Sequence, residues 1–505
     1  MKGFYCVHGH FYQPPREDPW TGEVPKEASA KPFHDWNQKI TAECYLPNTE
    51  ARILGASGKV KKVWNNFSHM SFDVGPTLLK WMRREAPAVY EKILQSDRDS
   101  RLLFQDHGNA MAQAYNHIIL PLANERDKET QLIWAVKDFS YRFGRAPEGL
   151  WLPETAVDLR SLEIMARLGI RFTLLAPHQA ERHRFQGETH WNLIRDQPLD
   201  PTVPYRVSLP SSDSIVVFFY HEGLSKGLAF ENLLQDGENL KKSFLSALPV
   251  PHTWPRLLSV ATDGETFGHH HRFGEMALAY LLYHLEMEKS AELINYGAYL
   301  EKFPVLHEAV IRENTSWSCV HGVGRWSRDC GCHMGGHEAW NQAWRKPLRE
   351  ALDWLRDAAK TPFEEAGGKL FRDPWEARND FIELLLETES EPETRNEFFR
   401  RHSRGALSPQ ESATGLELMQ LQYHLMAMYT SCGWFFDDPG GLETALILRH
   451  AARALEILKT QLQLNYEEDF LKYLSKMESN RPEIGDGRKI FQHAVAPDRR
   501  LQNFD

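Results

Sequence analysis

The sequence predicts an α/β fold, an incomplete (β/α)7 barrel over residues 1–305 that is followed by an α-helical domain over residues 306–505. In the first 300 residues, short apolar runs of strand character alternate with helical patterns, as in parallel strands joined by helical crossovers. Many of these runs stop at a His, Asp or Glu, the position of active-site residues in α/β barrels. After about residue 300 the strand-like runs disappear and long helical patterns dominate.

Seven apolar runs are predicted to be the barrel strands, one fewer than a complete (β/α)8 barrel has. They are Phe4–Val7, Val60–Phe67, Leu102–Phe104, Leu150–Leu152, Phe172–Leu175, Ile215–Tyr220 and Leu257–Ala261. Helices are expected between them over residues 77–94, 129–143 and 158–168. In the last of these, Leu162, Met165 and Leu168 recur on one helical face.

The C-terminal domain is predicted to be a bundle of amphipathic helices. The helical patterns cover residues 338–359, 375–386, 412–428, 442–462 and 466–477, with a break expected at the Glu-Glu-Ala-Gly-Gly of residues 364–368. A loop rich in Gly and Cys, residues 314–337, is expected to join the domains and contribute to the roof of the active site. Glycine allows the close approach of backbone to ligand that such a roof requires.

Charge and composition limit the partners that the chain can have. The net charge of −10 argues against nucleic acid or an anionic membrane as the main partner, because both repel a negative surface. No segment approaches the roughly 20 apolar residues of a membrane span, and the N-terminal apolar run is too short for a secretory signal. We therefore expect a cytoplasmic protein with six reduced cysteines. The oligomeric state stays open, and no cofactor is expected.

Two carboxylates stand directly after predicted strands, Glu154 in a Trp-Leu-Pro-Glu-Thr-Ala segment and Asp263 in a Thr-Asp-Gly-Glu-Thr-Phe segment. A carboxylate pair at a barrel mouth can divide the roles of acid and nucleophile across a glycosidic bond. Glu265 competes with Asp263 for the acid role, since residues two apart on a strand share a face. Orienting a neighbouring group is the role we expect for Glu265.

Three ordered motifs resemble conserved regions of glycoside hydrolase family 57, a family of retaining α-amylases, 4-α-glucanotransferases, branching enzymes and α-galactosidases. They are residues 8–15 (HGHFYQPP), 151–156 (WLPETA) and 262–269 (TDGETFGH). The resemblance implies a (β/α)7 barrel that acts on α-glucans, with Glu154 as nucleophile and Asp263 as general acid/base. It places the second and fifth family regions near residues 106–109 and 314–326. Residues 428–438 are similar to a C-terminal region of unassigned function in one branch of the family.

The candidate substrate-binding residues come from the strand ends and from the resemblance. They are His8, His10, Gln13, His107, Trp151, His221, Glu265, His269, Trp317 and Trp326. The resemblance favours hydrogen bonds from His8 and His10 to the sugar in the −1 subsite, although a His-x-His pair can also bind zinc. The three tryptophans could serve as flat platforms for sugar rings.

Three classes of function are consistent with these residues. The first is a retaining hydrolase or transferase of α-glucans. The second is a metal-dependent carbohydrate deacetylase or mannosidase that uses His8 and His10, and the third is a glycan-binding protein without turnover. The presence of both Glu154 and Asp263 favours the first class.

A cluster of Cys and His in the loop has two interpretations. Cys319, Cys330, Cys332 and His333, with His321 and His337 nearby, could bind zinc, but the spacing lacks the two Cys-x-x-Cys pairs of typical zinc sites. Packing of reduced thiols explains the same residues. We assign no metal here from the sequence.

Overall fold

The computed structural model describes residues 2–55, 57–248, 254–386 and 392–496. Contacts divide the chain into two compact units. The first unit contains Met1–Gln13, Asn37–Ala114 and Phe139–Trp317, and the second contains Pro14–Trp36, Tyr115–Asp138 and Ser318–Asp505. The predicted boundary between residues 305 and 306 stays a prediction, and the second unit includes two segments from the first third of the chain.

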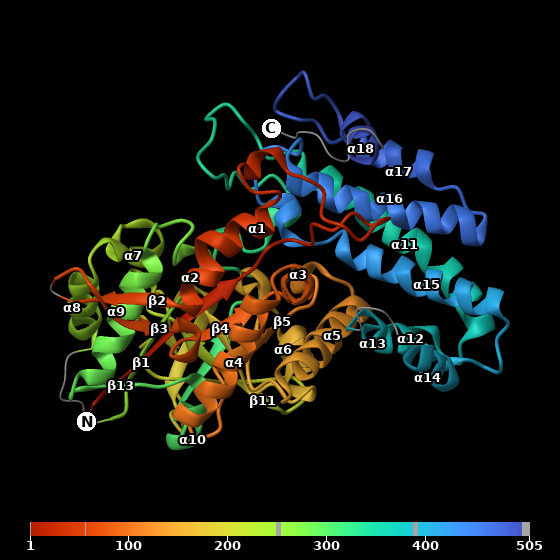
Figure 1. Ribbon diagram of the computed structural model, residues 1–505. Coiled ribbons are helices and arrows are strands. Elements are labelled where there is room, and N and C mark those ends of the chain that lie inside the picture. Colours follow the sequence, from red (N-terminus) through yellow and green to blue (C-terminus); the bar gives the residue numbers. More distant parts are fainter. Residues whose placement is uncertain (1, 56, 249–253, 387–391, 497–505) are drawn as a thin grey trace. The chain divides into compact units, whose positions relative to one another are not determined.

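Seven parallel strands form the barrel of the first unit (Figure 1). They are β1 (Gly3–Phe11), β4 (Ser71–Val74), β5 (Ala110–Gln113), β6 (Leu150–Trp151), β7 (Phe172–Leu175), β11 (Ser214–Phe219) and β12 (Leu257–Asp263). One ladder runs β12-β1-β4-β5-β6, and β7 pairs with β11. A parallel bridge from Gly149 to Phe172 joins the two groups, and the His221 amide donates to the Ser259 carbonyl at 2.7 Å, between the end of β11 and β12. The predicted (β/α)7 architecture is confirmed.

Strand β1 occupies the middle of its ladder, and all nine of its residues are buried. In the register with its two neighbouring strands, His10 is opposite Asp73 of β4 on one side and Asp263 of β12 on the other. Since alternate residues of a strand share a face, His8 and His10 point to the same side. The register therefore brings two histidines and two carboxylates to the carboxyl end of the sheet.

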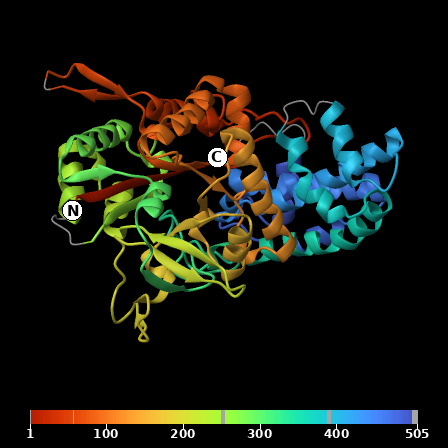
Figure 2. The ribbon, with the colours of Figure 1, turned by 90° about the horizontal axis from the view of Figure 1, so that it is seen from below.

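Further strands extend the β7-β11 sheet in the order β7-β11-β10-β14-β8-β9. They are β8 (Ala180–Phe185), β9 (Asn192–Leu193), β10 (Tyr205–Ser208) and β14 (His307–Ile311), and β13 (Ala291–Leu293) pairs with β1. Strand β14 corrects the expectation that strands end near residue 300. Figure 2 shows β2 (Ala51–Leu54) and β3 (Val60–Trp64) as a separate two-stranded hairpin.

Two of the seven predicted strands were placed wrongly. Val60–Phe67 begins in the exposed hairpin strand β3, and Leu102–Phe104 lies at the end of a helix, with Leu102 87% exposed. Short apolar runs do not distinguish a strand from a helix end or a hairpin. The barrel strands at these places are β4 and β5, which have the mixed sequences SFDV and AMAQ.

Helices connect the barrel strands. They are α1 (Trp36–Ile40), α2 (Leu46–Thr49), α3 (Pro76–Glu85), α4 (Pro87–Leu103), α5 (Glu125–Phe143), α6 (Leu159–Arg167), α7 (Glu222–Phe230), α8 (Gly237–Ala247), α9 (Gly274–Met287) and α10 (Tyr296–Lys302). Asp158 caps α6 by accepting from the Ser161 amide at 2.9 Å. The helix expected over residues 77–94 is two helices, because Pro87 begins the second one.

The second unit is helical, as predicted. It contains α11 (Arg345–Leu370), α12 (Pro374–Asp380), α13 (Ile382–Leu386), α14 (Pro392–His402), α15 (Pro409–Ala427), α16 (Leu442–Leu462), α17 (Glu467–Leu474) and α18 (Gly487–Val495). The bounds of α16 agree with the prediction. The break expected at residues 364–368 is wrong: these residues continue α11, whose Phe363 and Leu370 are buried in the core of this unit.

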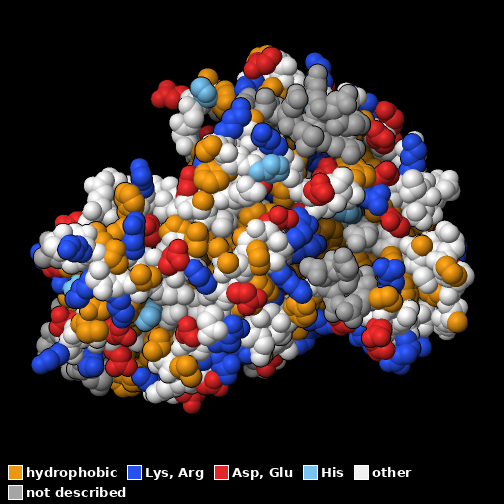
Figure 3. All heavy atoms as spheres, in the orientation of Figure 1, with side chains coloured by type: hydrophobic (Ala, Val, Ile, Leu, Met, Phe, Trp, Pro, Cys, Tyr) orange, Lys and Arg blue, Asp and Glu red, His pale blue; other side chains and the backbone are white. Residues whose placement is uncertain are grey.

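The core of the second unit includes a segment from early in the chain. Trp134 is fully buried and lies in the same apolar cluster as Phe381 and Phe398. Asp127 forms a buried ion pair with Arg378 at 2.7 Å. On the face drawn in Figure 3, basic and acidic side chains are interspersed, and among the described residues no helix is long and apolar enough to span a membrane.

Candidate active site

A buried carboxylate in β4 holds both histidines of β1. His8 Nε2 lies 3.0 Å from one oxygen of Asp73, and His10 Nδ1 lies 2.8 Å from the other. Ser71 Oγ lies 3.1 Å from His8 Nδ1, so both ring nitrogens of His8 have hydrogen-bond partners. The sequence analysis missed Asp73, although a carboxylate between two apolar residues of a strand is a signal that could have found it.

The two histidines differ in charge. Burial lowers the pKa of His8 and outweighs the opposing effect of Asp73. Burial also acts against the charged form of His10, but Asp73, Asp263 and Glu265 overcome it and raise the pKa of His10 to about 9. At neutral pH the site therefore contains one imidazolium, which faces several acidic groups.

Glu154 follows β6 in a short 3-10 turn, Pro153–Thr155. Its φ of 57° and the φ of 49° at Thr155 are left-handed values that cost energy for residues with a side chain. Gln179 stabilises this turn, because it accepts from Thr155 Oγ1 and donates to the Thr155 carbonyl, both at 2.8 Å. The Trp317 indole donates to Glu154 Oε2 at 3.1 Å. The carboxylate is thus held at the mouth of the barrel in a fixed direction.

Asp263 is the last residue of β12, in register with His10. Although the residue is exposed, the loss of hydration imposed by its surroundings raises the pKa of its carboxyl to about 7. His10 opposes this rise, while Glu265, Glu154 and Asp73 add to it. A carboxyl group with this pKa can be both a proton donor and a proton acceptor near neutral pH.

Glu265 is buried and holds structure around Asp263. Its Oε1 accepts from the Tyr45 hydroxyl at 2.6 Å and from the Tyr12 amide at 3.1 Å. Gln13 hydrogen-bonds the same Tyr45 hydroxyl. These contacts place Gln13 beside Glu265, and the orienting role expected of Glu265 stays a prediction.

Trp151 and Trp317 pack against the histidines. The Trp151 ring stacks on His8 and on His10 with centroids 4.9 Å apart in both pairs, and its edge meets Trp317 at 5.1 Å. Trp151 is fully buried, so its ring packs against the two imidazoles and is not exposed as a platform for a sugar ring. Trp317 is only partly buried.

Gln113, at the carboxyl end of β5, was missed by the sequence analysis. Met111 packs in the barrel core, and Gln113 points to the same side because it is two residues further along the strand. Its side chain is buried, yet neither its amide nitrogen nor its amide oxygen has a hydrogen-bond partner among the described residues, and the same holds for Trp151 Nε1. Unpaired buried polar atoms at a barrel mouth are suited to a polar ligand.

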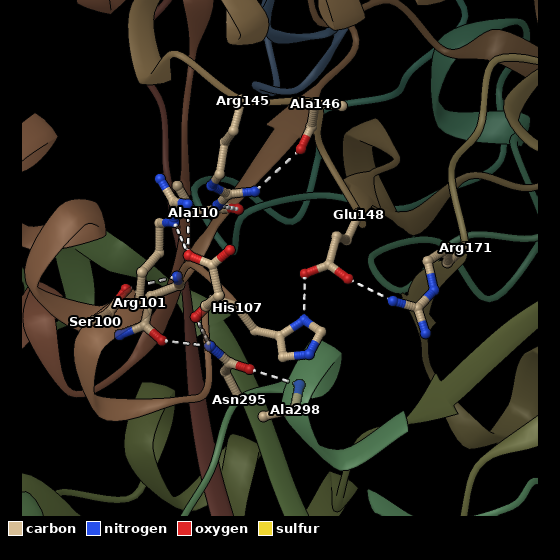
Figure 4. Close-up of polar contacts among 12 residues, drawn as sticks. Ser100, Arg101, His107, Ala110, Arg145, Ala146, Glu148, Arg171, Asn295 and Ala298 are labelled. Carbon is tan, nitrogen blue, oxygen red and sulfur yellow. Dashed lines mark hydrogen bonds and ion pairs between the residues drawn. The ribbon is translucent and has the colours of Figure 1, made fainter. Parts of the chain in front are cut away.

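His107 does not belong to this site. It precedes β5 and therefore lies at the amino end of the strands, where its Nδ1 contacts Glu148 Oε2 at 2.8 Å (Figure 4). Glu148 in turn pairs with Arg171 at 2.5 Å, and Asn295 donates to the His107 carbonyl at 2.8 Å. The sequence placed His107 at a strand end, but the run before it is the helix α4. Its polar partners form an ion-pair network at the opposite end of the barrel.

The remaining histidine candidates lie at loops after barrel strands. His221 follows β11 and caps α7, with its Nδ1 accepting from the Leu224 amide at 3.1 Å. His269 follows β12, and its Nδ1 lies 2.6 Å from Glu43 Oε2. His269 also lines a cavity of about 750 Å³ together with Glu43, Arg272 and Phe273.

Trp326 is a correction to the predicted set. It is fully buried in the second unit, and its indole donates to the Ser431 carbonyl at 3.2 Å. Arg349 Nε donates to the Trp326 carbonyl at 3.0 Å. It is a core tryptophan and offers no surface to a sugar. That the loop roofs the active site stays a prediction.

Comparison with protein-family models decides the family. The model described as glycosyl hydrolase family 57 matches residues 6–311, which hold the barrel from within β1 onward together with Glu154 and Asp263. The chain belongs to glycosyl hydrolase family 57. Its members are glycoside hydrolases and transglycosidases. A second model, a domain of unknown function (DUF3536), matches residues 340–502. No curated protein matches the chain in sequence.

Solved structures of this family share the fold at low sequence identity. A maltose-forming amylase from Pyrococcus sp. ST04 is 16% identical, with a TM-score of 0.68 over 98% of this chain and 89% of that chain. A branching enzyme from Thermococcus kodakaraensis is 14% identical, with a TM-score of 0.57 over 99% and 96%. An α-amylase from Thermotoga maritima is 12% identical, with a TM-score of 0.52 over 97% and 99%. These likenesses concern the fold alone.

Proposed function

We propose that this protein is a retaining α-glycosidase or transglycosidase of α-glucans, with Glu154 as nucleophile and Asp263 as general acid/base. One observation carries the proposal: two carboxyl groups at the carboxyl ends of barrel strands interact electrostatically and have different surroundings. The Glu154 side chain accepts the Trp317 indole N–H at 3.1 Å. Asp263 has a pKa raised to about 7, so a large fraction of it is protonated at neutral pH.

The proposed reaction has two displacements. Glu154 attacks the anomeric carbon and forms a glycosyl ester, while Asp263 gives its proton to the departing glycosidic oxygen. Asp263 then takes a proton from water or from an acceptor hydroxyl, whose oxygen attacks the anomeric carbon and releases Glu154. Water as the acceptor gives hydrolysis, and a sugar hydroxyl gives transfer. The solved relatives include an amylase and a branching enzyme, so both outcomes are open.

The substrate-binding roles follow from position. We assign His10, oriented by Asp73, to the sugar that is attacked, and Trp317 and Gln113 to the same place. His8 is fully buried and both of its ring nitrogens have protein partners, so we correct its expected sugar contact to a role in holding Asp73. Glu265 and Gln13 act through Tyr45, to which both are hydrogen-bonded. His221 and His269 stay proposed contacts in more distant subsites.

The alternative of a metal-dependent enzyme is less well supported by the geometry. His8 Nε2 and His10 Nδ1 are both hydrogen-bonded to Asp73, at 3.0 and 2.8 Å. A metal at this point would have to replace those hydrogen bonds. A glycan-binding protein without turnover would not need an acid with a pKa near 7.

Incubation with maltooligosaccharides and separation of the products tests the proposal. Proton NMR of the first product should show retention at the anomeric carbon. Glu154→Gly should be inactive and should yield an inverted glycosyl azide when azide and an activated substrate are supplied. Glu148→Gln, at the opposite end of the barrel, is the matched control and should remain active. An active Glu154→Gln enzyme, or an inverted product from the wild type, would overturn the mechanism.

A further inference from the structure

The four side chains Cys319, His321, Cys330 and Cys332 converge in the loop of the second unit. Each offers one ligand atom, and these four atoms all lie within 4.8 Å of one another. Cys319 Sγ lies 3.9 Å from Cys330 Sγ and 3.7 Å from Cys332 Sγ. Cys332 Sγ lies 3.5 Å from His321 Nδ1. We propose that this cluster is a tetrahedral Zn²⁺ site.

The distances are those that a tetrahedral zinc ion imposes on its ligands. With Zn–S of about 2.3 Å and Zn–N of about 2.0 Å, the tetrahedral angle requires S···S of about 3.8 Å and S···N of about 3.5 Å. The three separations given above are close to these values, and the other three pairs of ligand atoms lie within 4.8 Å of each other. A disulfide would require about 2.05 Å between two sulfurs, and no two cysteines among the described residues form a disulfide.

The backbone presents the ligands as two matched pairs. Cys319 and His321 are separated by Val320, which is 89% exposed, and Cys330 and Cys332 are separated by Gly331. Gly331 has a φ of +73°, a left-handed value that favours glycine. The Gly322 amide donates to the Cys319 carbonyl at 3.0 Å, so a turn carries Cys319 and His321, and the left-handed Gly331 places a bend between Cys330 and Cys332. In the sequence, Cys319, Cys330 and Cys332 were candidate zinc ligands, and the absence of Cys-x-x-Cys pairs argued against the metal.

The structure also corrects the candidate ligand set. His333, which the sequence grouped with the cysteines, accepts from the Gly335 amide through Nδ1 at 3.0 Å. His337 packs against Trp340 with ring centroids 4.3 Å apart. His321 is the histidine that completes the tetrahedron.

A buried cation balances the charge of the proposed site. Three thiolates and Zn²⁺ carry a net charge of −1, and Arg345 of α11 places Nη1 3.7 Å from Cys330 Sγ. Arg345 also donates to the Cys332 carbonyl at 2.9 Å and to the Trp434 carbonyl at 3.1 Å. Such outer hydrogen bonds orient metal ligands and stabilise thiolate charge. Three sulfur ligands and one imidazole favour zinc over the oxygen-preferring Mg²⁺ and Ca²⁺.

The site is independent of the glycosidase chemistry. Its ligands lie between residues 311 and 340, outside both matched family models. Four protein ligands leave no open coordination position, which is typical of structural zinc. The ion would fasten the loop to the start of α11 through Arg345.

Metal analysis of the full-length protein, purified after expression with added Zn²⁺, tests the proposal. We expect one zinc per chain in the wild type and less than a tenth of that in Cys330→Ser. His333→Ala, in the same loop, and Cys432→Ser, in the same unit, are matched controls that should retain one zinc.

A second measurement needs no variant. After chelator removes the metal, Co²⁺ should bind the wild type in a 1:1 ratio, with the visible bands of tetrahedral cobalt and a thiolate charge-transfer band, and Zn²⁺ should displace it. Zinc content unchanged in Cys330→Ser, cobalt bound without the thiolate band, or a disulfide between two of these cysteines would overturn the proposal. None of these readouts depends on turnover of a glucan.

Discussion

Trp317 holds Glu154 by two hydrogen bonds: its indole donates to Oε2 at 3.1 Å, and its backbone amide donates to the Glu154 carbonyl at 3.0 Å. The first bond orients the carboxylate, and the second fixes the strained turn that carries it. One residue, more than 160 positions away in sequence, therefore acts on both the side chain and the backbone of the proposed nucleophile.

Trp317→Phe removes the indole donor and keeps an aromatic ring. A hydrogen bond to a charged group contributes about 1.5–3 kcal/mol, so we expect kcat to fall by about 10- to 100-fold. Steady-state kinetics with a maltooligosaccharide measure this effect. The control is Trp326→Phe, which should lower Tm and leave kcat of the folded protein unchanged. Equal losses of kcat in both variants would contradict the distinction between these tryptophans.

The acid role of Asp263 predicts a pH profile. The pKa of about 7 means that activity should fall as the pH rises through 7, because the proton donor is lost. A substrate with an activated leaving group needs little protonation, so activity on it should not fall as the pH rises through 7. Glu265→Gln removes a charge that raises the pKa of Asp263, so the fall in activity should move to lower pH. A fall that stays at the same pH in this variant would assign it to another group.

His107→Gln should affect stability and not catalysis. The substitution removes an imidazole that lies 2.8 Å from Glu148, a partly buried contact for which about 1 kcal/mol is reasonable. We expect a lower Tm with kcat and KM within twofold of the wild type. His10→Gln, at the other end of the strands, should lose activity. A selective loss of kcat in His107→Gln would return this residue to the active site.

Gln113→Leu exchanges an unpaired buried amide for an apolar group of similar size. Removal of unsatisfied polar atoms should raise Tm, whereas loss of the proposed sugar contact should raise KM by about tenfold. Thermal unfolding and kinetics on the same samples separate the two effects. Met111→Leu, two residues earlier and in the apolar core, is the control and should leave KM unchanged. A lower Tm together with an unchanged KM would show that Gln113 has a structural partner.

The sequence predicted the catalytic strand ends because local signals mark them. Glu154 and Asp263 each follow an apolar run, and β6 and β12 lie where those runs were found. Strands β4 and β5 escaped detection, because SFDV and AMAQ become buried only through neighbouring strands and helices. The same tertiary origin explains why Asp73 and Gln113 were missed, since their importance comes from the residues opposite them.

The histidine candidates show a second reason for error. His107 and His8 both follow apolar runs in the sequence, but only one of those runs is a strand. A histidine that begins a strand lies at the opposite end of the barrel from one that ends it, so a single mistaken element moves a residue across the molecule. Trp326 differs: tryptophan is equally suited to a core and to a sugar platform, and only burial separates the two.

The composition of the second unit has a consequence for biosynthesis. Pro14–Trp36 and Tyr115–Asp138 emerge from the ribosome long before the helices with which they form one compact unit. Asp127 can form its buried ion pair with Arg378 only after about 250 further residues have been translated. The second unit therefore cannot complete its core during synthesis of the barrel. A fragment limited to residues 340–502 would lack Asp127 and Trp134, and a chaperone that shields these early segments would act on the nascent chain before the C-terminal helices exist.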